Sequence, residues 1–128
     1  MIMKEKKSFD ILIVDDEMVI CDFLKRFFQR DGQNPDVAQC GKQAFEKLNK
    51  KKYDLILCDL KMPKMNGLEF FSKMCNLHPE MADRIVFTSG GFTDDNNEYL
   101  IEGTGRPFVA KPMSLTTLQN LVLTYCPN

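Results

Sequence analysis

Five short runs of apolar and β-branched residues constrain the fold of this 128-residue chain more than any other feature. Each run is four residues long, which suits a β-strand, and its apolar residues are consecutive rather than alternating with polar ones. Continuous runs of this kind are typical of strands that are buried on both faces of a parallel sheet. The runs are 11–14, 35–38, 55–58, 85–88 and 107–110.

Longer stretches with apolar residues at helical spacing separate these runs. We expect five helices, at about 17–29, at 41–49, from Gly67 to the residue before His78, at 94–101, and from Ser114 to Pro127. The fourth has few apolar anchors and lies between glycines, so we expect it to be short or mobile. Alternating strands and helices predict an α/β fold, a single-domain three-layer sandwich around a parallel sheet.

Two details of the helices can be predicted. Ser114 is expected to cap the last helix. Five of that helix's side chains are expected to face the sheet, namely Leu115, Leu118, Leu121, Val122 and Tyr125. The lysine run 50–52 is expected to be a solvated helix end.

The composition excludes several classes of protein. The net charge of -1 lacks the positive field of a nucleic-acid binder, so we expect no direct nucleic-acid partner. No apolar run approaches the ~20 residues that span a bilayer, so we expect no membrane insertion and a cytoplasmic location. Five widely spaced cysteines without a C-x-x-C pair indicate reduced, mostly buried thiols rather than disulfides or a zinc site.

Polar residues follow the ends of four predicted strands. Because ligands bind beyond the carboxyl ends of strands in open α/β sheets, we expect these residues to converge on one cleft. They comprise three or four carboxylates, two hydroxyls and one ammonium: Asp15, Asp16, Glu17, Asp59, Thr88, Ser89 and Lys111.

Such a cluster of carboxylates needs protons or a cation, since neighbouring charges about 4 Å apart repel by about 4 kcal/mol at an effective dielectric of 20. With only oxygen ligands available, the expected ion is Mg²⁺, with Asp15 and Asp16 as its natural ligands. Asp59 is then a candidate nucleophile toward phosphorus, and Lys111 would steady the phosphoryl oxygens. Ser89 or Thr88 would hydrogen-bond the transferred group.

The motifs ILIVDDE, LILCDLKMPKMNG, IVFTSG and AKP, taken in this order, resemble the receiver domain of two-component response regulators. The resemblance covers about residues 9–125. It implies a flavodoxin-like (βα)5 fold with a five-stranded parallel sheet in the order 2-1-3-4-5. It also implies that residues 1–8 are an N-terminal tail and that 9–126 form the receiver domain.

By this resemblance, Asp59 accepts a phosphoryl group from a histidine kinase or a histidine phosphotransfer protein, and an unidentified downstream protein reads the result. Asp15, Asp16, Asp59 and the backbone carbonyl of Lys61 would hold Mg²⁺, and Lys111 would contact the phosphoryl group. Ser89 would be the switch hydroxyl, with Thr88 as its rival.

The resemblance has three further implications. Phe108 would be the switch aromatic. The Lys111-Pro112 bond would be cis. Gly67 is expected to supply a positive φ to the turn after the acceptor. Lys61 departs from the acidic or amide residue usual at its position in the family.

As a phosphoacceptor switch, the domain would not be an enzyme, except that it would assist its own phosphorylation and dephosphorylation. Two alternative functions remain. A phosphohydrolase like the haloacid dehalogenases would need a second aspartate where Lys61 stands, and a cap domain. A non-phosphorylated interaction module of the same fold would be expected to have lost one of the acids or the lysine, and none is lost.

Overall fold

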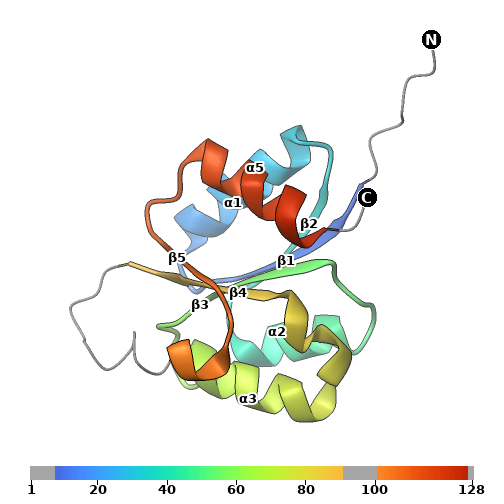
Figure 1. Cartoon of the computed structure of the whole chain (residues 1–128), viewed down its shortest axis with the longest axis vertical. Coiled ribbons are helices and arrows are strands. Elements are labelled where there is room, and N and C mark those ends of the chain that lie inside the picture. The colour runs from blue at the N-terminus through green and yellow to red at the C-terminus, as the bar shows by residue number, and fades with distance from the viewer. Residues whose placement is uncertain (1–7, 91–100, 127–128) are drawn as a thin grey trace.

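The computed structural model describes residues 8–90 and 101–126. These residues form one five-stranded parallel sheet in the order β2-β1-β3-β4-β5, as the resemblance implied (Figure 1). The strands are β1 (Asp10–Val14), β2 (Asn34–Ala38), β3 (Leu55–Asp59), β4 (Ile85–Ser89) and β5 (Phe108–Ala110). Each differs from its predicted run by one residue at most at either end.

Helices cover both faces of the sheet, which confirms the three-layer sandwich. On one face lie α1 (Met18–Arg30) and α5 (Leu115–Tyr125), and on the other lie α2 (Gly41–Leu48) and α3 (Gly67–Leu77) (Figure 1). A 3-10 helix, η1 (Pro79–Arg84), joins α3 to β4. Residues 101–104 are helical, whereas most of the predicted helix 94–101 lies outside the described residues.

Alternate residues of the strands supply two separate hydrophobic cores. Leu12, Ile56 and Phe87 pack with α2 and α3, whereas Ile13 and Leu57 pack with α1 and α5. The central strands β3 and β4 are buried along their whole length, as their continuous apolar runs predicted.

Polar caps fix where two helices begin. The Ser114 hydroxyl accepts a hydrogen bond from the Thr117 amide at 3.1 Å, which confirms the predicted cap of α5. The Asn66 side chain accepts one from the Glu69 amide at 2.9 Å and so begins α3 directly after the loop that leaves β3.

Two sequence predictions about helix residues were wrong. Leu115 does not face the sheet, because it is 56% exposed at the first turn of α5. Gly67 does not supply the positive φ, which falls on Lys64 instead, at 68°. Gly67 begins α3, and a Cβ there would lie 2.6 Å from the carbonyl oxygen of Asp59, so the site requires a glycine for close approach rather than for its φ.

The described residues also answer two questions raised by composition. None of their helices has the length and apolar character needed to cross a bilayer. The cysteines are free thiols, and Cys21, Cys58 and Cys126 are buried.

Candidate functional site

The candidate site lies at the carboxyl edge of the sheet, where β1 and β3 end side by side and β5 ends one strand further on, beyond β4. Asp15 follows β1, Asp59 is the last residue of β3, and Lys111 follows β5. The strand register pairs Val14 with Cys58, so the next residues along both strands, Asp15 and Asp59, lie at the same level. The parallel sheet therefore brings together residues that are 96 positions apart in the chain.

A single ammonium group bridges the two buried acids. Lys111 Nζ lies 2.7 Å from Asp15 Oδ2 and 3.3 Å from Asp59 Oδ2. The three side chains are only 12%, 3% and 5% exposed, respectively. The backbone of Lys111 is also fixed, because its amide donates to the Ser89 carbonyl at 2.7 Å.

Three of the predicted acids form a cluster that suits a metal ion. Asp15, Asp16 and Asp59 each offer a carboxylate oxygen, and these oxygens lie within 4.8 Å of one another. Asp15 and Asp59 are buried, whereas Asp16 is exposed. Hard oxygen donors of this kind, with one side open to water, fit Mg²⁺. Glu17 is exposed and contributes its backbone instead, since its amide donates to Asp15 Oδ1 at 2.9 Å.

The charge state of Asp59 reflects competing effects. Burial raises its pKa, and so does the charge of Asp15, while Lys111 and the Lys61 amide act in the opposite direction. The net result is a raised pKa. Burial alone would lower the pKa of Lys111, but its hydrogen bond to Asp15 and the charge of Asp59 outweigh burial and raise it. A cation is therefore held against a carboxylate that is poorly stabilised as an anion.

Both candidate hydroxyls lie at the end of β4, beside the acids. Thr88 pairs in register with Asp59, and Ser89 pairs with Ala110, the residue before Lys111. Both are buried, at 3% and 2% exposure. Phe108 is the first residue of β5 and packs, half-buried, against the core on the α2 and α3 side.

The loop after β3 wraps around Asp59. The Lys61 amide donates to Asp59 Oδ1 at 3.3 Å, and its side chain is exposed. Leu60 closes the loop, because its carbonyl accepts from the Gly67 amide at 2.9 Å. The Lys111-Pro112 peptide bond is cis, as the resemblance implied.

Sequence reasoning missed one group at the site. The Cys21 thiol, on α1, donates to the backbone carbonyl of Asp15 at 3.2 Å. Burial, together with the charge of Asp15, raises the pKa of this thiol to about 11, so it stays protonated as a donor. Cysteine is usually read as a small hydrophobe, and no sequence signal marks this contact.

Comparison with known families decides the assignment. The family model of the response regulator receiver domain matches residues 11–123. The chain belongs to the receiver family of two-component signalling. The match begins at the second residue of β1 and runs through most of α5, so all of the described sheet except Asp10, together with the acidic cluster, lies within the matched region.

Relatives of this receiver domain differ in length. It is 33% identical over 117 residues to sporulation initiation phosphotransferase F of Bacillus subtilis, covering 91% of this chain and 93% of that protein. It is 32% identical over 110 residues to the transcriptional regulatory protein ZraR of Klebsiella oxytoca, covering 86% of this chain but only 24% of that protein. The receiver domain thus spans about a quarter of the length of some relatives.

Two solved structures support the fold alone, because each is less than 25% identical to this chain. A response regulator receiver protein from Pseudomonas putida superposes with a TM-score of 0.83 at 24% identity, covering 94% of this chain and 99% of the other. A chemotaxis protein of Vibrio cholerae gives 0.82 at 23% identity, covering 93% and 99%.

Proposed function

We propose that this receiver domain is a phosphoacceptor switch in which Asp59 takes up a phosphoryl group from a histidine kinase or a histidine phosphotransfer protein. The observation that carries the proposal is the bridge from Lys111 Nζ to Asp15 and Asp59, beside a third carboxylate that completes an oxygen-rich cluster. Phosphoryl transfer needs in-line positioning and charge neutralisation more than covalent chemistry, and this arrangement supplies both.

The transfer step balances as a simple displacement. A carboxylate oxygen of Asp59 attacks phosphorus, the phosphorus–nitrogen bond of the phosphohistidine breaks, and the released imidazole nitrogen takes up a proton. Lys111 is already within 3.3 Å of Asp59 Oδ2 and neutralises charge on the incoming phosphoryl oxygens. The Lys61 amide, hydrogen-bonded to Asp59 Oδ1, orients the carboxylate so that its other oxygen is the nucleophile.

The residues present fit a magnesium ion. Asp15, Asp16, Asp59 and the Lys61 carbonyl would hold it, with water completing the coordination. When bound, Mg²⁺ supplies a positive charge that offsets the negative charge of the phosphoryl oxygens and of the acids. Asp16 would remain close to solvent and give the ion a path into the site.

The phosphoryl group changes the partners of the β4 and β5 ends. It adds negative charge at Asp59, which draws the hydroxyl of Ser89 and the ammonium of Lys111 toward it. Because the Lys111 amide donates to the Ser89 carbonyl, movement at one strand end is transmitted to the other. Phe108, at the start of β5, would change its packing and so alter the surface that a downstream protein recognises.

In this proposal the domain is residues 9–126, preceded by a tail of residues 1–8. It assists its own phosphorylation and dephosphorylation and turns over no other substrate. The phosphohydrolase alternative has no supporting observation, since Lys61 stands where that mechanism needs a second aspartate. A downstream protein and a cytoplasmic location stay predictions.

The test is incubation with acetyl phosphate and Mg²⁺, read by intact mass, and with beryllofluoride and Mg²⁺, read by amide shifts. The wild-type chain is expected to gain the mass of one phosphoryl group and to shift at the ends of β3, β4 and β5. Asp59→Asn should do neither. The matched control is Asp83→Asn on the surface of η1, which should behave like wild type. Equal labelling of wild type and Asp59→Asn would refute the acceptor assignment.

A second pair of variants separates the two hydroxyls. We propose Ser89 as the switch hydroxyl because it ends β4 at the sheet edge and its carbonyl holds the Lys111 amide. Ser89→Ala is expected to keep phosphorylation but lose most amide shifts on β5, whereas Thr88→Ala should keep them. The reverse pattern would assign the role to Thr88.

A further inference from the structure

The short acidic segment between β1 and α1 is held at its backbone by the helix. The thiol of Cys21, in the first turn of α1, donates to the backbone carbonyl of Asp15 at 3.2 Å. The Asp15 amide donates to the carbonyl of Ala38, at the end of β2, at 3.0 Å. In the described part of the chain no backbone amide donates to the Asp15 carbonyl, so the thiol is its donor. One strand and one helix therefore fix the two backbone polar groups of Asp15.

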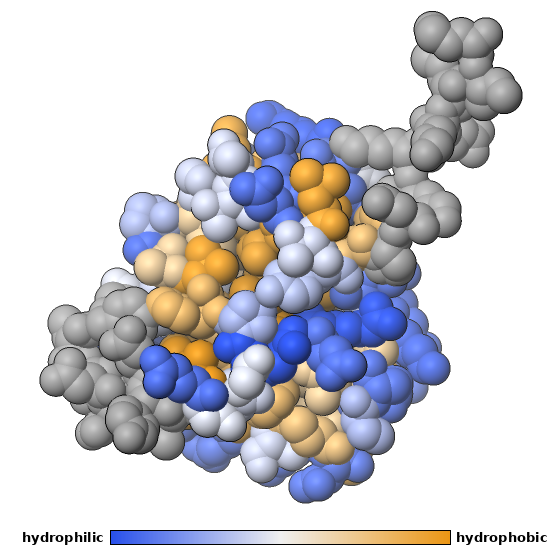
Figure 2. Space-filling view, in the orientation of Figure 1, coloured by the Kyte–Doolittle hydropathy of each residue, from blue (hydrophilic) through white to orange (hydrophobic). Residues whose placement is uncertain are grey.

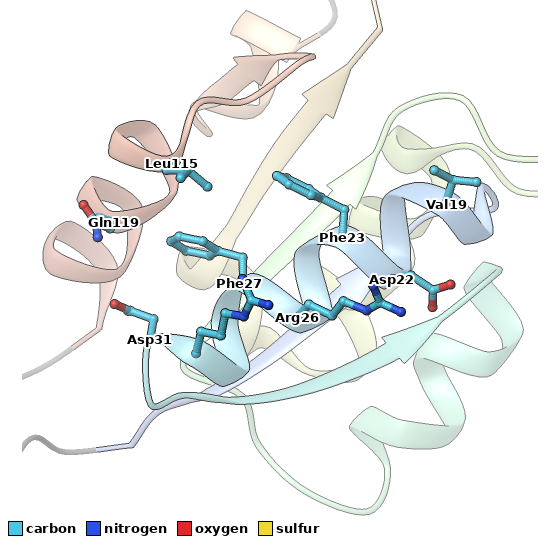
Figure 3. Close-up of a pocket in the computed structure, with 9 residues that line it drawn as sticks. Val19, Asp22, Phe23, Arg26, Phe27, Asp31, Leu115 and Gln119 are labelled. Atoms are coloured by element: carbon cyan, nitrogen blue, oxygen red, sulfur yellow. The ribbon is translucent and has the colours of Figure 1, made fainter.

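Cys21 lies on the buried side of α1. It is 3% exposed and belongs to the same core as Leu24 and Phe28. The opposite side of the helix carries Val19 and Phe23, which line a groove between α1 and α5 (Figure 3). Figure 2 shows apolar atoms reaching the surface around α5 among hydrophilic neighbours. A substitution at Cys21 therefore changes a contact with the acidic segment and leaves the exposed face of α1 as it is.

The carbonyl that Cys21 binds belongs to the peptide that joins Asp15 to Asp16. A peptide unit is planar, so the direction of this carbonyl also fixes the direction of the Asp16 amide and the positions of both α-carbons. The side chains of the two acids leave from these α-carbons. A hydrogen bond to the Asp15 carbonyl therefore restricts the directions in which both carboxylates can point.

Of these two acids, Asp16 depends more on its backbone. The Asp15 carboxylate is held by Lys111 Nζ at 2.7 Å and by the Glu17 amide at 2.9 Å. The Asp16 carboxylate is exposed, and it forms no hydrogen bond or ion pair with any residue that the structure describes. One of its oxygens nevertheless lies within 4.8 Å of oxygens of Asp15 and Asp59. The backbone, rather than a side-chain partner, therefore holds Asp16 toward the cluster.

We propose that Cys21 is a positioning residue for the candidate magnesium site, whose thiol fixes the peptide between Asp15 and Asp16 and so holds the Asp16 carboxylate beside the other acids. The inference rests on the metal site of the proposed function and adds to it a group on α1 that is not itself a ligand. A ligand that is already in place loses less conformational freedom when the ion binds, so the thiol raises the affinity for Mg²⁺.

Calorimetric titration of the full chain with MgCl₂ tests the role of the thiol. Cys21→Ala and Cys21→Ser have side chains of nearly the same size, but only serine has a hydroxyl that can replace the donor. Cys21→Ala is expected to raise the dissociation constant of Mg²⁺ about fivefold, as the loss of one hydrogen bond would. Cys21→Ser should return it to within about twofold of wild type. Both variants lose similar packing, so the difference between them reports the donor.

The matched control is Cys126→Ala, which removes another buried thiol from the same core. Cys126 is 5% exposed and follows α5, outside the acidic site. Its loss should lower stability in urea but leave the affinity for Mg²⁺ unchanged. The amide shift of Asp16, measured without Mg²⁺, reports the peptide plane directly. It should move in Cys21→Ala, return toward the wild-type value in Cys21→Ser, and stay unchanged in the control.

Two results would overturn the positioning role alone. One is an affinity for Mg²⁺ that is the same in Cys21→Ala and wild type. The other is equal weakening in Cys21→Ala and Cys21→Ser, which would assign the effect to packing. A wild-type chain that binds no Mg²⁺ would instead refute the metal site itself, and this proposal with it. The titration uses the unphosphorylated chain, so its result stands whether or not Asp59 proves to be the phosphoacceptor.

Discussion

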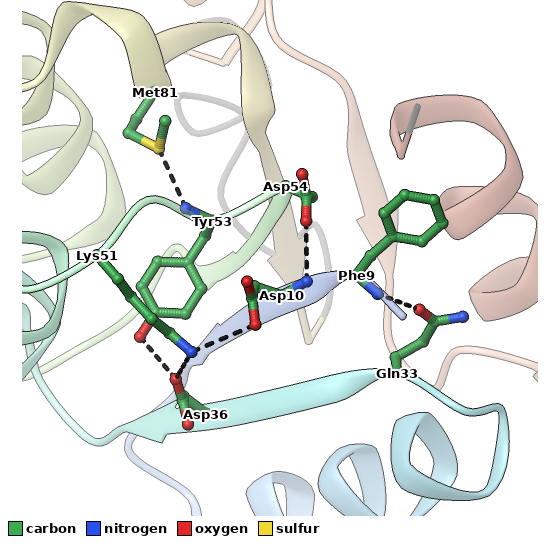
Figure 4. Close-up of polar contacts among 8 residues, drawn as sticks. All are labelled: Phe9, Asp10, Gln33, Asp36, Lys51, Tyr53, Asp54 and Met81. Carbon is green, nitrogen blue, oxygen red and sulfur yellow. Dashed lines mark hydrogen bonds and ion pairs between the residues drawn. The ribbon is translucent and has the colours of Figure 1, made fainter. Parts of the chain in front are cut away.

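The two edges of the sheet carry similar residues in different surroundings. At the carboxyl edge, Lys111 joins Asp15 and Asp59. At the amino edge, Lys51 Nζ lies 3.0 Å from Asp36 Oδ2 and 3.3 Å from Asp10 Oδ1 (Figure 4). The lysine side chain is 42% exposed at the amino edge but only 12% exposed at the carboxyl edge.

The two edges of the sheet also differ in the hydrogen-bond donors that reach their acids. The Tyr53 hydroxyl donates to Asp36 Oδ2 at 2.7 Å, and the Asp10 amide donates to Asp54 Oδ2 at 2.9 Å (Figure 4). Burial alone would raise the pKa of Asp36, but Tyr53 and Lys51 outweigh burial and lower it. At Asp59 burial prevails and the pKa is raised.

The comparison shows that a lysine between carboxylates does not by itself mark a reactive site. At the amino edge the acids are partly hydrated and well supplied with donors, so they stabilise the fold. At the carboxyl edge Asp59 is more buried than its donors can offset, which leaves it ready to take a metal ion and a phosphoryl group. Four predictions test this distinction.

The largest effect is expected from removing the lysine at the carboxyl edge. Lys111→Met should slow phosphorylation by acetyl phosphate about a hundredfold, because a buried cation at the developing charge is lost. Lys51→Met should leave that rate unchanged. The measurement is the rate of mass gain with saturating Mg²⁺, and equal losses in both variants would show that the two lysines are equivalent.

Neutralising one acid at each edge should change stability in opposite directions. Without Mg²⁺, Asp59→Asn is expected to raise the free energy of unfolding by about 1 kcal/mol, because a poorly compensated buried charge disappears while Lys111 keeps Asp15. Asp36→Asn should lower it by about 1 kcal/mol, since charge-assisted bonds from Tyr53 and Lys51 are weakened. Urea denaturation measures both, and changes of the same sign would contradict the comparison.

The pH dependence of stability should separate the same two acids. Because the folded pKa of Asp59 lies above its ordinary 3.8, the folded chain binds that proton first, and stability rises as pH falls through the folded pKa. The amount by which Asp59→Asn exceeds wild type in free energy of unfolding should therefore shrink on acidification and be gone by about pH 4.

The contribution of Asp36 to stability changes with pH in the opposite direction. Its folded pKa lies below 3.8, so its contribution to stability is present above pH 3.8 and is lost as pH falls through the folded pKa. The free energy of unfolding of Asp36→Asn should therefore stay below that of wild type down to about pH 4, and the difference should vanish only at lower pH. The measurement is the urea midpoint of each variant and of wild type from about pH 3 to pH 7, without Mg²⁺. The difference between Asp59→Asn and wild type should disappear at a higher pH than the difference between Asp36→Asn and wild type. If both differences disappeared over the same pH range, the opposite pKa shifts of the two acids would be refuted.

The smallest effect is expected from Tyr53→Phe. Asp36 keeps its contact with Lys51, so the loss of one hydroxyl donor should lower the free energy of unfolding by only about 0.5 to 1 kcal/mol. Phosphorylation of Asp59 should be unaffected. A change in the phosphorylation rate would show that the amino edge is coupled to the acceptor site.

The sequence predicted the local and periodic features well. Continuous apolar runs located all five strands, and the Ser114 cap and the spacing of apolar residues located α5, because both depend on near neighbours in the chain. The rule for parallel sheets also predicted that Asp15, Asp59 and Lys111 would meet, since it states where strand ends lie.

Other features depend on contacts between distant segments, and only the tertiary structure decided them. Lys51 belongs to a run expected to be a solvated helix end, yet it reaches Asp10 and Asp36 because β1 and β2 pass beside it. Phe23 and Leu115 have the spacing of core residues, yet neither reaches the sheet. Periodicity identifies an apolar face, but packing determines how much of that face is covered, and here part of the apolar face of α1 stays exposed.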